Sequence, residues 1–361
     1  MTVSRPPRKP GKPGKPGKVR AARLTDLAAL GELSRLCQSD DPVTRSLGLP
    51  VNGPPIGMFS LFRLPLGAFR PNDLMYVYEQ DGRLAGLVRV ERESSRDEWT
   101  IVELDGVGLA DAGDIRYRLV QQILREGSKR GAARFHVACA DADGNVELLM
   151  QAGFMRYGEE EVLFRSAGAA MPEPWSDEAA ADARIRPAQP VDALALHRLY
   201  TSATPSPVAR LEAIRIPDWE RHGTHWRVPR SSLAPILRFA DVEVFVQATD
   251  GGGKDGTMLD GLVQIGVAKE DQPHYLKLMA RPESDVSALI EYGLGIIASR
   301  TTRGGDHRHD HGVIAPVRTY EAPLDRRLED AGFDRIASVT LLLKETVIRV
   351  AEPALVPAGV R

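Results

Sequence analysis

The sequence predicts an α/β protein of two tandem domains, each a mixed, mostly antiparallel sheet flanked by helices. The chain has 361 residues, enough for two domains that each bury a core. Hydrophobic residues make up 43% and charged residues 27%, as in soluble globular proteins. The third observation is an internal repeat, in which the same short motifs recur in the same order along both halves.

Four pairs of motifs make up this repeat, and the spacing between partners stays within a narrow band. Order and spacing together indicate a duplicated domain rather than chance matches. The pairs are Val19–Ala22 with Asp26 and Ile185–Ala188 with Asp192; Leu84–Val88 and Leu259–Val263; Asp114-Ile115 and Asp285-Val286; and Ala152–Phe154 with Arg156 and Ala331–Phe333 with Arg335.

In the first repeat, a short strand leads into a helix that carries Leu27, Leu30 and Leu33 at helical spacing. The pair Asp81-Gly82 then predicts a hairpin turn between two strands. Further on, the spacing of apolar residues from Ile115 predicts an amphipathic helix. The expected strands cover 74–78, 84–90, 99–104, 133–138 and 160–164, with helices beginning at 115 and 145.

The second repeat predicts the same order, with a glycine-rich loop in place of the tight turn. Strands are expected at 242–247, 262–267, 274–278, 313–317 and 337–343, with helices from 286 and 322. The two domains therefore cover residues 19–165 and 184–345. A Pro- and Ala-rich linker joins them at 166–183, a basic Pro/Gly/Lys arm precedes them at 1–18, and a tail follows at 346–361. We expect the arm to be disordered; it fits a solubilising tail better than a loose binding site for phosphates.

Bulk properties exclude several classes of function. The net charge of -2 does not favour a nucleic-acid partner. The sequence has two cysteines, Cys37 and Cys139, too far apart for a metal or disulfide motif, which fits a reducing cytoplasm. No apolar run reaches the roughly 18 residues of a membrane span. We therefore expect a cytoplasmic protein without a membrane span.

The order of elements and the motifs in each repeat resemble the GNAT superfamily of acyl-CoA N-acyltransferases. The resemblance is carried by the I/V-R-x-A opening with its aspartate, the hairpin ending in L-x-G-L-V, and the closing A-G-F, and it covers both repeats. It implies acetyl-CoA or another acyl-CoA as co-substrate and a small-molecule or peptide amine as acceptor. A tandem pair, often with one silent half, is known in that superfamily. We expect a monomer with an internal pseudo-dimer, or a homodimer.

In the superfamily, the loop before the central helix carries R/Q-x-x-G-x-G/A and holds the CoA pyrophosphate on backbone amides at the helix N-terminus. Here Asp111 to Arg116 align with it, and both closing small residues are lost. Asp114, and Asp285 in the second repeat, are predicted to cap their helices and occupy those amides. That chemistry counts against ordinary acetyl-CoA binding. The cofactor-binding residues that the resemblance implies are Val107, Leu109, Gly113, Ile115 and Arg116.

Glu103 and Asp105 are the candidate catalytic residues. The superfamily often places a carboxylate base on the third antiparallel strand, where strand alternation puts these two on one face. The simpler alternative is a pair of solvated carboxylates. The usual acid, a tyrosine four residues before Gly-Phe, is replaced by Leu149 and Leu328. The second repeat offers only His274 and Lys277, so the first half is the preferred catalytic unit.

Two other stretches stand out. His307, His309 and His311 have metal-capable spacing, but glycines flank them as in a surface loop, so no metal cofactor is expected. Residues 41–71 are rich in Phe, Leu and Met. In the resembling fold this region walls the acceptor side, which implies either an apolar acceptor or packing against the other half; packing is the simpler expectation. The rival to an acyltransferase is a non-catalytic protein of the same fold that binds a small ligand or a partner.

Overall fold

The computed structural model describes residues 17–40, 73–93, 97–107, 112–140, 144–220, 228, 230–235, 237, 239–249, 258–268, 272–303 and 312–346. Most of the basic arm, the apolar stretch 41–71, the histidine-rich stretch around His309 and most of the tail lie outside these residues. Within them, no helix is both long and apolar enough to cross a membrane.

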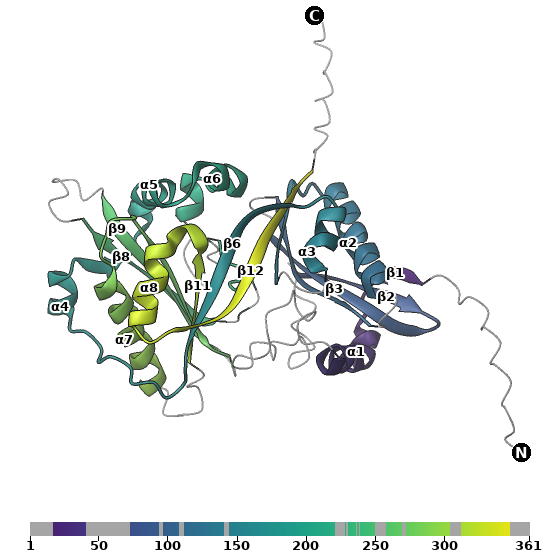
Figure 1. Ribbon diagram of the computed structural model, residues 1–361, viewed down its shortest axis with the longest axis horizontal. Coiled ribbons are helices and arrows are strands. Elements are labelled where there is room, and N and C mark those ends of the chain that lie inside the picture. The colour runs from purple at the N-terminus through teal and green to yellow at the C-terminus, as the bar shows by residue number, and fades with distance from the viewer. Residues whose placement is uncertain are drawn as a thin grey trace, which may run out of the picture.

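The elements follow the predicted order in both repeats (Figure 1). The first comprises β1 (Lys18–Ala21), α1 (Leu27–Asp40), β2 (Asp73–Gln80), β3 (Arg83–Glu93), β4 (Glu98–Gly106), α2 (Ala112–Lys129), β5 (Arg134–Cys139), α3 (Asn145–Gln151) and β6 (Met155–Arg165). After α4 (Asp177–Asp182), the second comprises β7 (Ile185–Pro187), α5 (Ala193–Ala203), α6 (Ser206–Glu212), β8 (Phe239–Ala248), β9 (Leu259–Ala268), β10 (His274–Ala280), α7 (Ser287–Arg303), β11 (Val313–Arg318), α8 (Ala322–Asp330) and β12 (Asp334–Glu345).

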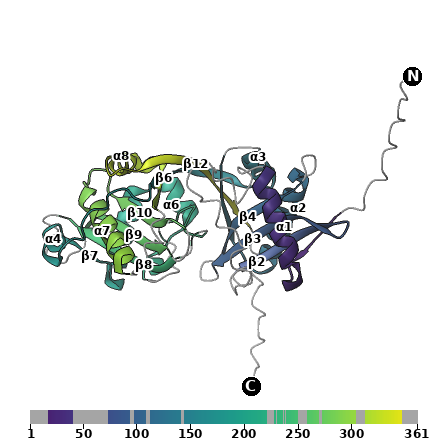
Figure 2. The same cartoon turned by 90° about the horizontal axis from the view of Figure 1, so that it is seen from below.

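All these strands form one 12-stranded sheet, in the order β1-β2-β3-β4-β5-β12-β6-β11-β10-β9-β8-β7. The order is symmetric when each strand of one repeat is replaced by its counterpart in the other. The last strand of each repeat has crossed over: β12 pairs with β5, and β6 pairs with β11. Figures 1 and 2 show two lobes joined by these crossing strands. The duplicated fold is therefore a single intertwined unit.

Helices cover both faces of the sheet in each lobe. In the first lobe, α2 packs on one face over Val88, Val90 and Ile101, whereas Leu30 and Leu33 of α1 pack on the opposite face. In the second lobe α7 and α8 share a core that α5 does not join. At the centre, Leu233, Ala234 and Leu237 cover the face of the exchanged strands.

The repeated motifs have structural roles. Arg20 donates two hydrogen bonds to Asp26, at 2.7 and 2.9 Å, and Arg186 makes the same fork with Asp192 at 2.7 and 2.8 Å. Each aspartate also accepts from the amide three residues before it. The fork fastens the first strand to the following turn, which explains the shared arginine and aspartate.

The glycines of the two hairpin motifs lie beneath helices. A Cβ on Gly86 would lie 2.4 Å from Ile115 Cγ2, and one on Gly261 would lie 2.9 Å from Val286 Cγ1. A register shift precedes each glycine, as expected for a bulge beside a close approach. The glycines of the closing motif, at φ 89° and 83°, end α3 and α8 in the left-handed conformation.

Candidate functional site

The candidate site of the first half lies where β4 leaves β5. The two strands pair in parallel from Glu98 to Ile101 and no further. There, β4 has a bulge: Glu103 faces Arg89 of β3, but Ile101 faces Val90, so Val102 has no opposite residue. In the second half, β10 pairs with β9 without a register shift. Bulges often occur next to active sites, where they redirect side chains.

Glu103 and Asp105, the predicted catalytic residues, lie just beyond this bulge and are both buried, at 4% and 5% exposure. Arg89 lies beside Glu103: its Nε donates to Glu103 at 3.3 Å, and its Nη1 lies 3.5 Å from Asp73 of β2. Burial raises the pKa of Glu103 above its ordinary value, and the neighbouring Arg89 offsets part of that rise. The interpretation of solvated edge carboxylates is therefore wrong for this pair.

The N-terminus of α2 differs from the prediction. The helix begins at Ala112, so Asp114 is its third residue and not its N-cap; its carboxylate is more than half exposed and accepts from Arg118 Nε at 2.7 Å. Gly113 is exposed, with nothing within 4 Å of the position of a Cβ. The prediction that Asp114 is the N-cap of this helix is therefore wrong.

The other residues that the resemblance assigned to the cofactor have mixed positions. Ile115 is buried in the core, where only its backbone can face a ligand. Val107 packs partly buried beside α1, and its amide donates to Ala85. Arg116 is buried, at 8% exposure, and its Nη1 donates to Asn145 Oδ1 at the start of α3. Leu109 lies outside the described residues.

In the second half, Asp285 binds a helix amide as predicted, although it lies two residues before the first residue of α7. Asp285 Oδ1 accepts from the amide of Ser287, the first residue of α7, at 3.1 Å, and from its hydroxyl at 2.8 Å. These bonds lower the pKa of Asp285. Next to it lies a cavity of about 160 Å³, bordered by Glu283, Asp285 and Glu321 as well as by Arg281 and Arg327. Carboxylates in this position disfavour a pyrophosphate.

The two titratable residues predicted on the corresponding strand of the second half take part in structural bonds. Lys277, 1% exposed, donates to Glu321 at 3.0 Å and to the carbonyl of Pro316 at 3.2 Å. His274 Nδ1 accepts from the amide of Ala268 at 3.1 Å. Leu149 and Leu328, which replace the usual tyrosine, are both buried in cores.

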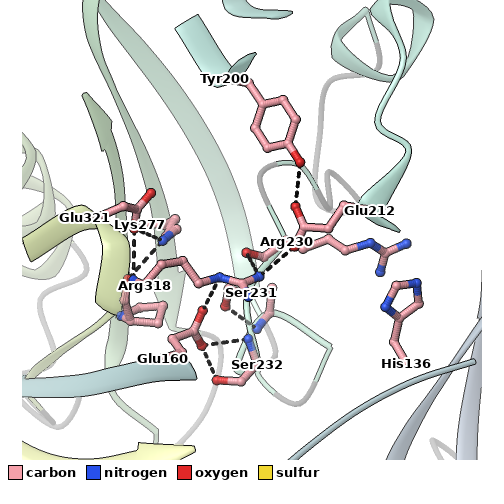
Figure 3. A network of polar contacts seen from close by, with 12 residues as sticks. His136, Glu160, Tyr200, Glu212, Arg230, Ser231, Ser232, Lys277, Arg318 and Glu321 are labelled. Carbon is pink, nitrogen blue, oxygen red and sulfur yellow. Dashed lines mark hydrogen bonds and ion pairs between the residues drawn. The ribbon is translucent and has the colours of Figure 1, made fainter. Parts of the chain in front are cut away.

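A buried polar network at the centre of the sheet was missed from the sequence (Figure 3). Arg318 lies 3.2 Å from Glu160 and 3.0 Å from Glu212. Tyr200 donates to Glu212 at 2.7 Å, and the amide of Ser232 donates to Glu160 at 2.8 Å. No motif predicts it, because its members are scattered over both repeats and meet only after the strands exchange.

The network also ties the second half to β4. Arg230 forms ion pairs with Glu98, the first residue of β4, and, at 3.5 Å, with Glu93 of β3. Glu98 in turn lies 3.5 Å from His136 of β5. A cavity of about 30 Å³ adjoins these side chains, between β4, β5 and the segment 230–235. The described residues contain no cluster of three or more metal-capable side chains.

Comparisons with known proteins identify the fold. No family model matches the sequence, and no curated protein matches it. Among solved structures, a tandem GNAT protein from the clavulanic acid biosynthesis pathway is similar over 91% of this chain and 98% of its own, with a TM-score of 0.51 and 12% identity.

A GCN5-related N-acetyltransferase from Sphaerobacter thermophilus is similar over 91% of this chain and 95% of its own, with a TM-score of 0.50 and 15% identity. Because each alignment covers 91% of this chain, both run through both repeats. At these identities the likeness concerns the fold. The chain is thus a tandem GNAT-fold protein.

Proposed function

We propose that the first half is an acyl-CoA-dependent N-acyltransferase and that the second half supports it without a reaction of its own. The observation that carries the proposal is the buried pair Glu103 and Asp105, directly beyond the bulge where β4 parts from β5. The N-terminus of α2 supports it, because Gly113 is open and Asp114 turns away to Arg118. A helix N-terminus of this kind suits the phosphates of an acyl-CoA.

In the proposed reaction, the nitrogen of the acceptor amine attacks the thioester carbonyl. A C–N bond forms, the C–S bond breaks, and the proton lost by the amine passes to Glu103. A base with a raised pKa suits this step, because it still gains the proton readily near neutral pH. The sulfur leaves as a thiolate, which takes a proton from solvent, since a thiol has a pKa of about 8.5. Because the thiolate takes its proton from solvent, the reaction does not need the acidic tyrosine that Leu149 replaces.

The first test is calorimetric titration of the full chain with acetyl-CoA and longer acyl-CoAs. We expect binding by the wild type. Folded protein that binds none of them at millimolar concentration would favour the rival function, a GNAT-fold protein that binds another ligand or a partner. That rival rests on the carboxylate of Asp285 at the start of α7 and on the two leucines at the tyrosine position.

The second test is Glu103→Gln, assayed by CoA release with a panel of amines. Gln keeps the contact with Arg89 but cannot accept the proton, so we expect kcat to fall by about 10²- to 10⁴-fold, with acyl-CoA binding retained. In the wild type we expect kcat/KM to rise as the pH rises through the elevated pKa of Glu103, because the deprotonated carboxylate is the active form. In the variant this rise of kcat/KM with pH should be missing. Glu178→Gln, at an exposed position on α4, is the matched control. An unchanged kcat in Glu103→Gln would exclude Glu103 as the base.

A further inference from the structure

The small cavity at the centre of the sheet adjoins the site of the first half. Its floor is Thr100 to Val102 of β4 and His136 to Ala138 of β5, which are the last two paired residues of each strand and the first residue beyond them. Thr100 alternates with Trp99 and Ile101, whose side chains belong to the α2 core, so it lies on the opposite face. Glu103 belongs to that same opposite face, because it bonds Arg89, which alternates with Val88 and Val90 of the α2 core.

The opposite wall of this cavity comes from the second half. Ser231, Ser232 and Pro235 border it, together with Leu341 of the exchanged strand β12 and Arg318 of β11. The first half therefore does not enclose this space by itself.

Several bonds hold the wall in place. Arg230 is ion-paired with Glu98 of β4, and Ser232 donates through its amide and its hydroxyl to Glu160. Ser231 Oγ accepts from the amides of Leu233 and Ala234, at 3.1 and 3.2 Å. Glu160 is fully buried. A wall fixed by buried charged hydrogen bonds resists displacement by a ligand.

We propose that the segment 230–235 of the second half limits the acyl group that the first half transfers, with Pro235 as the residue that sets its length. The inference rests on the proposed function. The cavity, of about 30 Å³, holds a group the size of one or two water molecules. In this proposal it accepts the methyl group of an acetyl thioester, and Pro235 at its border blocks the further carbons of a longer chain. The second half, without a reaction of its own, is thus a specificity element for its neighbour.

The test is calorimetric titration of the full chain with acetyl-, propionyl- and butyryl-CoA. We expect the wild type to bind acetyl-CoA at least about 10-fold more tightly than propionyl-CoA, the usual discrimination for one methylene. Pro235→Ala removes ring atoms from the wall and should reduce this ratio to about 3-fold or less. Ala138→Val, which fills the cavity from the β5 side, should weaken acetyl-CoA binding. Circular dichroism and thermal melting check that each variant folds.

Pro323→Ala is the matched control, since Pro323 borders the larger cavity of the second half; its ratio should equal that of the wild type. Acetyl-CoA binding with an unchanged ratio in Pro235→Ala, or equal affinity of the wild type for acetyl- and butyryl-CoA, would overturn the inference and leave the proposed function standing. A wild type that binds no acyl-CoA would overturn both.

Discussion

At the scale of single residues, the residues that recur in both repeats are those that the fold requires. The arginine–aspartate fork, the glycine beneath the helix and the left-handed glycine recur because each half needs them to close its sheet on its helices. The candidate site residues differ between the halves. Glu103 is hydrogen-bonded to Arg89, whereas its counterpart Lys277 is bound to Glu321.

The fork predicts a pH-dependent loss of stability in Asp26→Asn. The bond from Arg20 lowers the pKa of Asp26 below its ordinary value of 3.8, so its contribution is complete above that value and is lost as the pH falls through the lowered pKa. At pH 7 we expect the variant to lose about 1–2 kcal/mol in free energy of unfolding, measured by urea denaturation. The difference should shrink as the pH falls through the lowered pKa and vanish once Asp26 is protonated in the folded protein. Asp182→Asn, at an exposed position, is the control; a difference that does not shrink on acidification would contradict the prediction.

At the scale of elements, the two central helices begin differently although their sequences align. Asp114 lies inside the first turn of α2, whereas Asp285 precedes α7 and accepts from its first amide. The carboxylate of Asp285 thus occupies the first amide of α7, whereas the carboxylate of Asp114 is bonded to Arg118 on its own helix. The bulge in β4 is a second difference, because the corresponding strand of the second half, β10, has no bulge.

This difference predicts unequal effects of two alanine substitutions. Asp285→Ala should destabilise the protein by about 1 kcal/mol, the usual cost of a lost cap. Asp114→Ala should cost less than about 0.5 kcal/mol, since it loses an exposed pair with Arg118 and a favourable charge near the start of the helix. Urea denaturation of both variants at pH 7 measures this. Equal losses would mean that Asp114 also caps its helix.

At the scale of the whole molecule, the exchanged strands make the duplication indivisible. Leu342 of β12 belongs to the core of the first lobe, and Leu163 of β6 belongs to the core of the second. The network around Arg318 and Glu160 lies between them, and such buried ions are stable only when every partner is present.

We therefore expect that neither residues 1–165 nor residues 166–361 fold alone, and that the two fragments form a complex when coexpressed. Each fragment by itself leaves a strand without its neighbours and an open sheet edge. Far-UV circular dichroism and size-exclusion chromatography provide the measurement. A stable, monomeric 1–165 fragment with its own cooperative melting transition would contradict the exchange.

Much of the fold could be predicted from the sequence, because periodicity and turn residues act locally. The strand–helix order, the turn at Asp81-Gly82 and the glycine-ended helices all depend on neighbours within a few residues. The short helix α6 was not predicted, since only packing against the rest of the lobe selects it. The burial of Glu103 also escaped prediction, since alternation assigns a residue to a face but not what covers it.

The sequence by itself determined that this protein is a duplication, that each copy is a mixed sheet with helices, and that the first copy carries the carboxylate pair. Only the tertiary structure decided which copy each last strand joins and which aspartate binds the first amide of its helix. It also decided that Arg230 and Arg318 of the second half pair with Glu98 and Glu160 of the first half at the centre of the sheet (Figure 3). The physical reason is the distance along the chain between the residues that interact. Local patterns define elements, whereas strand exchange and buried ion pairs depend on residues far apart in the chain, whose contacts exist only once the sheet has formed.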